Sequence, residues 1–476
     1  MFTIEDILKG TGGEIISGRG RSIVATGVSI DSRTMSKGEL FIAIKGENFD
    51  GHNFLSEAFK KGACAVIVMD RSLWNVPEGL KDVPIVMVSD TVKALGDLAR
   101  FHRKRFDIPV VAVTGSNGKT TVKDMISFLL QDNFEVLKTE GTKNNQIGVP
   151  LTLLKLDGSY DAAVLEIGMN HKGEIARLTE IAGPSIGLIT NIGPSHIEFF
   201  KDLDGILEAK LELARLLKKD GTLILNGDDK YLARVNSLPC KIVRFGEGDR
   251  FDVAAIKVER IDDNWSFVTK DGVRFKTQML GRESVANALG AIACASLFGI
   301  PTIKMAVTFS EFILPKMRMS PKSVNGIRFI DDTYNANPLS FKCAVDTLAN
   351  IKIKGKRIIV CGDMLELGKE SRRYHAELGR QIATSGINIL ITVGKLSEDV
   401  GVTAKELGME ASSVWHFASS DDAARALKGL AHDGDTILVK GSRRVGLERI
   451  IDYWDSTKSA PCRWPGSSSV SNNTTI

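Results

Sequence analysis

The chain has 476 residues, of which 43% are hydrophobic, 25% charged and 7% aromatic, a composition typical of a globular protein with several domains. The net charge of +4 is too small over this length to indicate a nucleic-acid partner. No signal-peptide segment is present, and no apolar run reaches the roughly 18 residues needed to cross a bilayer. Six scattered cysteines form no metal-binding pattern. These features disfavour secreted, membrane-spanning and disulfide-stapled classes, and we expect a cytoplasmic protein without a membrane span.

The first hundred residues alternate short apolar runs with amphipathic ones. The pattern predicts strands at Leu40–Ile44, Ala65–Met69 and Pro84–Val88, and helices at Asn53–Lys60 and Val92–His102. A basic and aromatic stretch ends just before Pro109, and this change of composition is typical of a boundary. We therefore expect a small α/β domain at residues 1–108.

From Val110 the pattern becomes strand, glycine-rich loop and helix. The predicted elements are strands at Val110–Thr114, Ala162–Ile167, Ser185–Thr190 and Thr222–Leu225, and helices at Thr120–Leu130 and Gly205–Leu217. Such alternation is typical of a parallel sheet covered by helices on both faces. We expect this central domain to span residues 109–314.

A third alternation follows, at residues 315–456. It predicts strands at Gly326–Asp331, Arg357–Cys361, Ile387–Val393 and Thr436–Val439, with a helix at Leu339–Ala349. We expect a smaller, Rossmann-like α/β domain here. Residues 457–476 are rich in Ser, Asn and Thr and lack periodicity, so we expect a disordered tail. The predicted fold class is therefore α/β, in three domains.

The strongest motif joins the strand Val110–Thr114 to the helix that follows it. Its glycines let backbone N–H groups turn inward and bind an anion at a helix N-terminus. Lys119 would reach the β- and γ-phosphates, and the Thr120 hydroxyl would hold Mg²⁺. The loop is shorter than the general phosphate-loop pattern, which has a glycine where Val113 stands. We predict an ATP-binding loop made of Gly115, Ser116, Asn117, Gly118, Lys119, Thr120 and Thr121.

Three further residues follow predicted elements of this domain. Glu166 ends a strand beside the loop, where a carboxylate can bind Mg²⁺ directly, although a solvated strand end explains it as well. His196 lies in a Gly-Pro loop after a strand. It is either a metal ligand or an ordinary loop histidine. Lys210 stands in a helix, where a solvated face is the simplest interpretation. No guanine-reading N-K-x-D motif occurs, which weakens a GTPase interpretation.

Six motifs in order, from about Ser29 to about Glu448, resemble the Mur ligase family of peptidoglycan synthesis. They are Ile30-Asp-Ser-Arg33, Leu40–Gly46, Thr142–Leu154, Asp331–Pro338, Gly362–Gly368 and Lys440-Gly-Ser-Arg443. The resemblance implies an ATP-dependent ligase that forms an amide bond through an acyl phosphate. It implies UDP-N-acetylmuramoyl-tripeptide and D-alanyl-D-alanine as substrates.

The resemblance also implies a metal site. Family members carry a carbamylated lysine at the position of Lys210, and its new carboxylate would help to hold a second Mg²⁺. Thr120, Glu166 and His196 would complete the metal ligands. The implied catalytic residues are Lys119, Glu166, His196 and Lys210.

Further residues are assigned by the same resemblance. Asn287 would contact adenine, although Glu283 stands where family members usually have His. Arg318 and Asp332 would reach ATP, the alternatives being a linker cation and a turn residue. The implied substrate-binding residues are Ser32, Arg33, Lys45, Gly46, Asn144, Asn145, Tyr334, Asn335 and Arg443. For Arg33 a surface turn remains an alternative, and for Arg443 a helix-capping role.

Other functions remain open at this point. Within the family, a ligase that adds the third amino acid or a folylpolyglutamate synthase shares the phosphate loop. Outside it, a P-loop small-molecule kinase or ATPase explains Lys119 and Thr120 but leaves Lys210 and Asn287 without a role. We expect a monomer that binds no nucleic acid.

Overall fold

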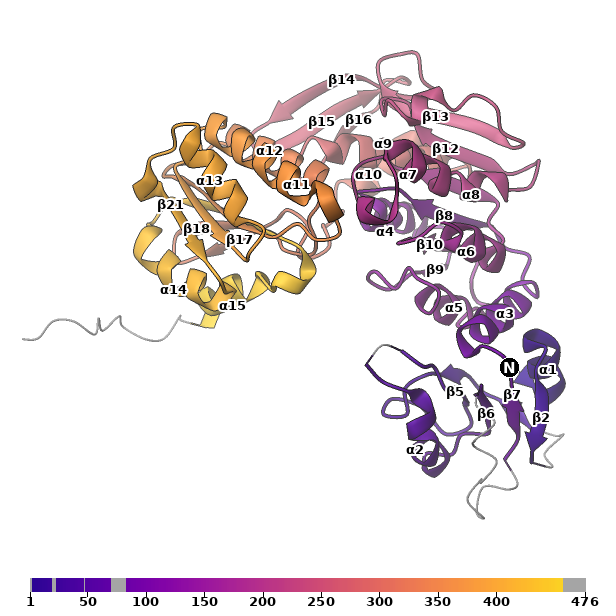
Figure 1. The fold of residues 1–476 in the computed structure, drawn as a ribbon. Coiled ribbons are helices and arrows are strands. Elements are labelled where there is room, and N and C mark those ends of the chain that lie inside the picture. The colour runs from indigo at the N-terminus through magenta and orange to yellow at the C-terminus, as the bar shows by residue number, and fades with distance from the viewer. Residues whose placement is uncertain (1, 19–22, 47, 70–82, 457–476) are drawn as a thin grey trace, which may run out of the picture. The chain divides into compact units, whose positions relative to one another are not determined.

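The structure, a computed structural model, describes residues 2–18, 23–46, 48–69 and 83–456 (Figure 1). The predicted tail at 457–476, with Cys462, lies outside these residues. The chain divides into two compact units, Met1–Pro315 with Glu366–Lys369, and Lys316–Leu365 with Glu370–Ile476. No helix among the described residues is long and apolar enough to cross a membrane.

A five-stranded sheet opens the first unit. Its strands run in the order β2 (Glu14–Ser17), β7 (Ile85–Met87), β6 (Ala65–Val68), β5 (Leu40–Ile42) and β4 (Val28–Ser29). All neighbours are parallel except β2 and β7. The helices of this part are α1 (Ile4–Thr11), α2 (Leu55–Lys60) and α3 (Thr91–Arg103). Apolar residues of α1 and α3 pack on one face of the sheet and those of α2 on the other.

A nine-stranded sheet forms the centre of the first unit. Its order is β16 (Arg274–Lys276), β15 (Asn264–Thr269), β14 (Val253–Ile261), β13 (Lys241–Glu247), β12 (Thr222–Asn226), β11 (Ile186–Ile189), β8 (Val110–Thr114), β10 (Ala162–Glu166) and β9 (Val136–Lys138). The strands from β14 to β9 are parallel, whereas β15 and β16 form an antiparallel extension. Strand β8, which carries the phosphate loop, therefore lies inside the sheet with a parallel neighbour on each side.

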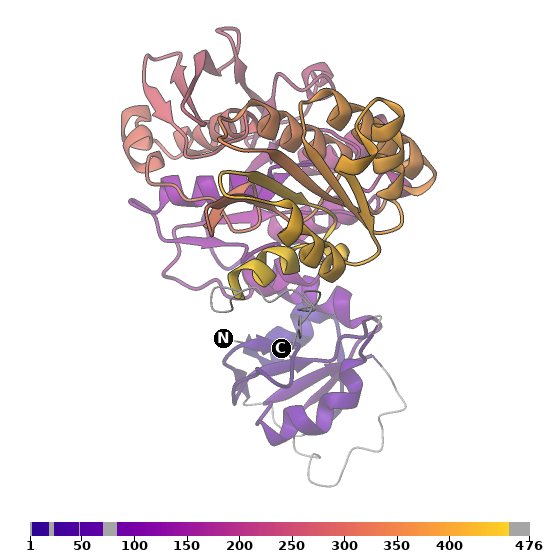
Figure 2. The same cartoon turned by 90° about the vertical axis from the view of Figure 1, so that its left-hand side faces the viewer.

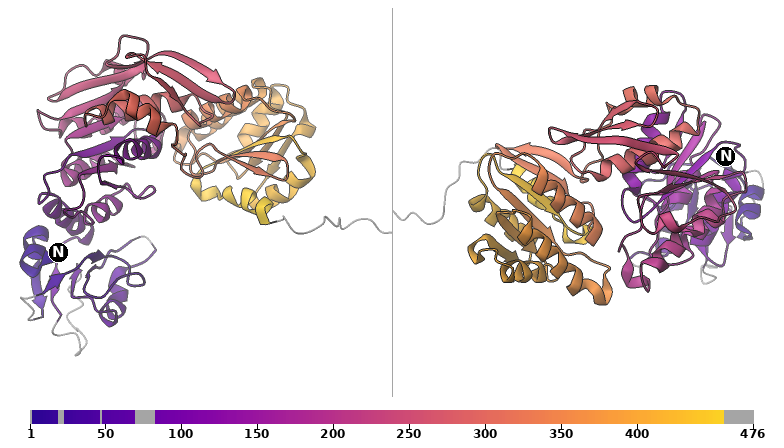
Figure 3. Two further views of the ribbon diagram at one scale, coloured as in Figure 1. Left: turned by 180° about the vertical axis from the view of Figure 1, so that it is seen from behind. Right: turned by 90° about the horizontal axis from the view of Figure 1, so that it is seen from above.

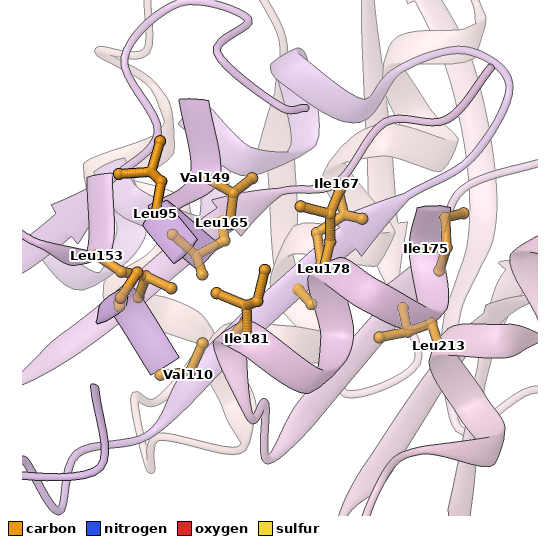
Figure 4. Packing of buried hydrophobic residues seen from close by; sticks show 14 of the residues in the cluster. Leu95, Val110, Val149, Leu153, Leu165, Ile167, Ile175, Leu178, Ile181 and Leu213 are labelled. Atoms are coloured by element: carbon orange, nitrogen blue, oxygen red, sulfur yellow. The ribbon is translucent and has the colours of Figure 1, made fainter. Parts of the chain in front are cut away.

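Helices cover both faces of this sheet. One face packs against α3, α5 (Gly148–Leu153), α6 (Glu174–Ala182), α7 (Leu203–Lys210) and α8 (Glu212–Arg215), with the packing seen in Figure 4. The other face packs against α4 (Lys119–Leu130), α9 (Glu283–Ser296) and α10 (Thr302–Phe309). In Figure 4, Val110 and Leu165 of the strands meet Leu153, Leu178 and Ile181 of the helices. Burial of apolar area on both faces explains why these strands read as continuous apolar runs.

The second unit is a six-stranded sheet between two layers of helices. Its order is β17 (Ser320–Val324), β18 (Ile327–Asp332), β22 (Thr436–Lys440), β19 (Arg357–Gly362), β20 (Ile389–Val393) and β21 (Val414–Phe417), and only β17 is antiparallel to its neighbour. One layer consists of α14 (Ser420–Leu430) and α15 (Glu448–Ser456). The other contains α11 (Pro338–Asn350), α12 (Ser371–Thr384) and α13 (Glu398–Glu406), as Figures 1, 2 and 3 show from different directions.

The structure confirms the expected α/β class with parallel sheets and adds two features. The antiparallel strands β15 and β16 were not predicted. The single helix expected at Gly205–Leu217 is interrupted at Leu211, which separates α7 from α8. Here the backbone leaves regular helical geometry (ψ −9°) directly after the buried Lys210.

His102, on α3, is buried where the N-terminal part meets the central sheet of the same unit. Its ring lies 5.0 Å from those of Phe2 and Phe106, and its Nε2 lies 2.8 Å from the carbonyl oxygen of Leu156. Burial lowers the pKa of His102, because the charged imidazolium loses its hydration.

Stability is therefore expected to depend on pH through His102. Since its folded-state pKa is lowered, stability is full above the unfolded value of about 6.5 and is lost as the pH falls below it. Substitution His102→Gln removes the titration and is expected to make the loss between about pH 6.5 and 5 shallower. Urea unfolding across this range measures the effect, and the exposed His432→Gln is the control. An unchanged pH dependence in His102→Gln would contradict it.

Candidate nucleotide site

The phosphate loop leaves the end of β8 and enters α4 through two glycines that no other residue can replace without strain. Gly115 has φ +144° and Gly118 has φ +82°. A Cβ atom at Gly115 would lie 1.9 Å from Oγ1 of Thr190, and one at Gly118 would lie 2.5 Å from Oδ1 of Asn287. Both glycines are thus required by backbone conformation and by space. The second contact also places the predicted adenine residue, Asn287 of α9, directly against the loop.

Helix α4 begins at Lys119 without a side-chain cap. An uncapped helix N-terminus presents N–H donors and a partial positive charge, and it binds anions such as phosphate. The Lys119 ammonium donates to the carbonyl oxygens of Gly115 (2.9 Å) and Ser116 (3.3 Å), so it lies over the loop. Thr120 and Thr121, in the first turn, are buried. The predicted loop residues are thus gathered at one point.

Glu166 is a buried carboxylate beside this loop. It ends β10 and pairs in register with Val113 of β8, and its side chain is 1% exposed. Its Oε1 accepts a hydrogen bond from Nδ2 of Asn144 (2.7 Å), whereas Oε2 has no hydrogen-bond partner among the described residues. A buried carboxylate oxygen without a partner is costly, and it fits a cation ligand. The alternative of a solvated strand end is wrong.

Lys210, the last residue of α7, is buried, so the alternative of a solvated helix face is also wrong. Its pKa is lowered well below the usual value, first by burial and then by the charge of Lys119. This second cause places the two lysines in the same electrostatic environment. A neutral amine is a nucleophile, which is the state of lysine that carbamylation by CO₂ requires.

His196 follows β11, the other parallel neighbour of β8. It has a left-handed backbone (φ 55°) and begins the turn Ile197–Phe199. Because β8, β10 and β11 are parallel, the segments that follow them leave the same edge of the sheet. Thr120, Glu166 and His196 all belong to these segments, as a shared metal site requires.

The two asparagines predicted after the phosphate-loop helix have different environments. Asn144 binds Glu166, as described above. Oδ1 of Asn145 accepts hydrogen bonds from the N–H groups of Ile147 (3.2 Å) and Gly148 (2.9 Å) at the start of α5. Asn145 therefore organises the loop, and its role in substrate binding stays a prediction.

Two polar residues near this edge were not revealed by the sequence patterns. Glu212 accepts hydrogen bonds from the N–H groups of Gly173 and Ala176 and so stabilises the start of α6. Asn191 follows β11 and bonds to the backbone of the phosphate loop. The run Thr190-Asn191 in the sequence was the available signal, but its contact residues lie 74 positions earlier in the chain.

The predicted residues of the N-terminal part lie after adjacent parallel strands, β4 and β5. Ser32 is buried and donates to a carboxylate oxygen of Glu57 (2.8 Å). Arg33 is 81% exposed and forms a two-point ion pair with Asp31, whose pKa it lowers to about 2. Lys45 and Gly46, after β5, are exposed. Exposed cationic groups at one sheet edge are accessible to a diphosphate.

In the second unit, the predicted residues gather at the ends of β18 and β22. Asp332 and Lys440 pair in register and form an ion pair of 2.6 Å between a buried lysine and a partly buried carboxylate. The Lys440 ammonium also donates to the carbonyl oxygen of Asn335 (3.0 Å). The guanidinium of Arg318 lies 4.1 Å from the ring centroid of Tyr334. Lys440 thus fixes the start of the segment that carries Tyr334 and Asn335.

Arg443 lies just beyond β22 in the second unit. Its Nη1 lies 3.4 Å from Glu448 Oε1 and 3.4 Å from Met317 Sδ. It keeps an accessible guanidinium, since its side chain is 54% exposed.

A parallel sheet with a phosphate loop at its centre, next to a buried carboxylate and a desolvated lysine, defines a P-loop nucleotide-binding protein of the α/β class. Three family models match the chain: the Mur ligase family catalytic domain at residues 24–103, the Mur ligase middle domain at 113–295 and the Mur ligase glutamate ligase domain at 317–443. The chain belongs to the Mur ligase family.

Individual relatives extend over nearly the whole chain. A UDP-N-acetylmuramoyl-tripeptide–D-alanyl-D-alanine ligase of Bacillus subtilis is 38% identical over 94% of this chain and 97% of its own. A crystal structure of MurF from Acinetobacter baumannii superposes with a TM-score of 0.86 at 30% identity, covering 96% of this chain and 99% of its own. The MurF ligase of Thermotoga maritima in complex with ADP has a TM-score of 0.79 at 26% identity, covering 91% and 98%.

These findings confirm the expected family, the three-domain α/β fold and an enzyme of the ligase class. A P-loop kinase or ATPase outside the family is set aside, because the similarity is not confined to the phosphate loop and includes the third domain. The domain boundaries and the roles of single residues stay predictions.

The ion pair between Lys440 and Asp332 is expected to be important for the stability of the second unit. Substitution Lys440→Met leaves the partly buried carboxylate of Asp332 without its cation, and we expect a loss of about 2 kcal/mol in unfolding free energy. The double variant Lys440→Met/Asp332→Asn, which carries neither charge, should recover part of this loss. Urea unfolding measures both. The exposed Lys405→Met, in the same unit, should change stability by less than about 0.5 kcal/mol, and an equally small effect of Lys440→Met would disprove the expectation.

Proposed function

We propose that this protein joins D-alanyl-D-alanine to UDP-N-acetylmuramoyl-tripeptide at the expense of ATP and so makes the pentapeptide precursor of peptidoglycan. The observation that carries the proposal is the similarity over 94% of the chain to a curated ligase of that description. The phosphate loop, the buried Glu166 and the desolvated Lys210 supply the chemistry that such a reaction needs.

The reaction has two steps. A carboxylate oxygen of the tripeptide attacks the γ-phosphorus of ATP, the bond to the β,γ-bridging oxygen breaks, and an acyl phosphate and ADP form. The dipeptide amine then attacks the acyl carbon, phosphate leaves, and the amine loses a proton. Since a carboxylate does not react with an amine, phosphorylation creates the leaving group. Most of the catalysis then lies in positioning and charge stabilisation.

Lys119 and the first-turn N–H groups of α4 would bind the β- and γ-phosphates and stabilise the negative charge of the transferring group. The donors for metal binding are Thr120, Glu166, His196 and the carbamate of Lys210, and the oxygens among them suit a hard cation. Magnesium held there supplies positive charge that offsets the charge of the phosphates. We propose two ions, with the carbamate helping to hold the second.

The remaining predicted residues divide between ATP and the other substrates. Asn287, Arg318 and Asp332 are proposed to contact ATP, with Glu283 replacing the family histidine. Ser32, Arg33, Lys45 and Gly46 would bind the UDP end, and Asn144 and Asn145 the peptide part. Tyr334, Asn335 and Arg443 would receive the dipeptide, whose carboxylate suits the planar guanidinium of Arg443. We propose that the enzyme works as a cytoplasmic monomer.

The proposal predicts that ADP release requires both substrates. With ATP, Mg²⁺ and UDP-N-acetylmuramoyl-tripeptide, adding D-alanyl-D-alanine should start release of ADP and phosphate in a 1:1 ratio with a new pentapeptide product. The measurement is a coupled ADP assay with product detection by mass spectrometry. A free third amino acid, supplied with the UDP-dipeptide acceptor, is the control for the other ligase of the pathway. ATP hydrolysis that ignores both substrates would refute the proposal.

Carbamylation of Lys210 is tested separately. We expect Lys210→Ala to lower kcat by about 100-fold, because the variant lacks the carbamate that helps to hold the second Mg²⁺. This factor corresponds to about 2.7 kcal/mol of transition-state stabilisation. Short carboxylic acids should restore part of the activity, whereas the exposed Lys219→Ala should behave like the unchanged protein. Carbon-13 NMR with labelled bicarbonate should show a carbamate signal that Lys210→Ala lacks. Full activity of Lys210→Ala would eliminate the carbamate.

A further inference from the structure

The phosphate loop is held in place from outside, by the segment Thr190–Gly193 that follows β11. The Ser116 hydroxyl donates to the carbonyl oxygen of Gly193 (2.9 Å) and accepts from the N–H of Gly193 (2.9 Å). The Thr190 hydroxyl donates to the carbonyl oxygen of Asn117 (2.5 Å). The missing side chain of Gly115 makes room for this approach of Thr190.

Asn191 makes the central contacts of this segment. Its Oδ1 accepts from the N–H of Asn117 (2.9 Å), and its Nδ2 donates to the carbonyl oxygen of Asn117 (3.1 Å). Its own carbonyl oxygen accepts from the N–H of Ser116 (3.0 Å). Asn191 thus binds the backbone N–H and carbonyl oxygen of Asn117 and the backbone N–H of Ser116.

These contacts fix which loop groups face outward. The N–H groups of Ser116 and Asn117 are engaged with Asn191, and the Asn117 carbonyl is held by Asn191 and Thr190. A carbonyl oxygen turned toward a phosphate would repel it, so an orientation that keeps this oxygen occupied favours anion binding. Phosphate binding is expected at the N-terminus of α4, which has no side-chain cap.

The segment Thr190–Gly193 is itself held by hydrogen bonds from the residues at and after the end of β12. Nδ2 of Asn226, at the end of β12, donates to the carbonyl oxygen of Thr190 (3.0 Å), and a carboxylate oxygen of Asp229 accepts from the N–H of Ile192 (2.9 Å). Hydrogen bonds on both sides of Asn191 therefore hold it while it holds the loop. His196 follows five residues later on the same segment.

We propose that Asn191 is a positioning residue for nucleotide binding: it holds the phosphate loop in its anion-binding conformation before ATP arrives, and it ties that loop to the segment carrying His196. The inference rests on the proposed function only in that the loop binds ATP. When the loop is already ordered, none of the binding free energy of ATP is used to order it. Loss of Asn191 therefore weakens nucleotide binding selectively.

The test is a calorimetric titration of the full chain with the magnesium complex of a non-hydrolysable ATP analogue. Asn191→Ala should bind at least tenfold more weakly than the unchanged protein and raise KM for ATP by a similar factor, with KM for D-alanyl-D-alanine within twofold. The control is Asn236→Ala, an exposed asparagine of the same unit that should bind normally. Asn191→Ala binding within twofold of the unchanged protein, or an equal rise in both KM values, overturns the inference.

A second variant covers the case in which Asn191→Ala does not fold. Asn191→Asp keeps the volume and the acceptor for the Asn117 N–H but loses the donor to its carbonyl. It should also bind the analogue at least fivefold more weakly, with a melting temperature close to normal, and normal binding would overturn the inference. If the unchanged protein binds the analogue but does not ligate the dipeptide, the proposed function fails while this inference stands.

Discussion

Three parallel strands in register, β10, β8 and β11, impose the constraint on which the nucleotide site depends. Parallel strands end at the same edge, so the segments after them are brought together whatever their separation in the chain. The phosphate loop follows β8, Glu166 ends β10, and Asn191 and His196 follow β11. Residues between positions 115 and 196 are thereby brought to one edge of the sheet. Helices on both faces bury the strands.

Burial of charged groups is the second determinant of the site. Glu166 and Lys210 are almost completely removed from water, although such groups are stable inside a protein only when they are paired, neutral or bound to an ion. The two residues meet this requirement differently. Glu166 keeps one oxygen bonded to Asn144 and leaves the other open, whereas Lys210 has a lowered pKa and so favours the neutral amine. The environment of both groups is set by the core around them.

The sequence was informative where chemistry is local. Val110–Thr114 is mostly apolar and β-branched, and it is followed by glycines and then by helical periodicity, so strand, loop and helix could all be predicted from neighbouring residues. The antiparallel extension of β15 and β16 was not, because β16 is only three residues long with two charged residues, and β15 follows β14 through a turn in which Asp262 has φ +55°. The break at Leu211 also depends on packing, and the helical pattern of the sequence continues through it.

Single side-chain environments could be predicted less well than the motifs that contain them. Lys210 has the sequence neighbourhood of an exposed lysine, and only the tertiary structure buries it. The contacts of Asn191 reach Ser116 and Asn117 across 74 or more positions, and no local pattern encodes them. Of the residues assigned by family resemblance, Asn287 lies beside the phosphate loop, and Asp332 and Asn335 both contact Lys440, while the roles of these residues stay predictions.

The contact between Gly118 and Asn287 has a consequence for how this enzyme can vary. The amide of Asn287 occupies the space where a side chain at position 118 would stand, so the two positions are linked although 168 residues separate them along the chain. A larger residue at 118 would displace the amide, and a shorter one at 287 would open a gap beside the loop. Neither position can drift alone. An inhibitor that binds against both positions would therefore leave few single substitutions that abolish its binding and keep this contact intact.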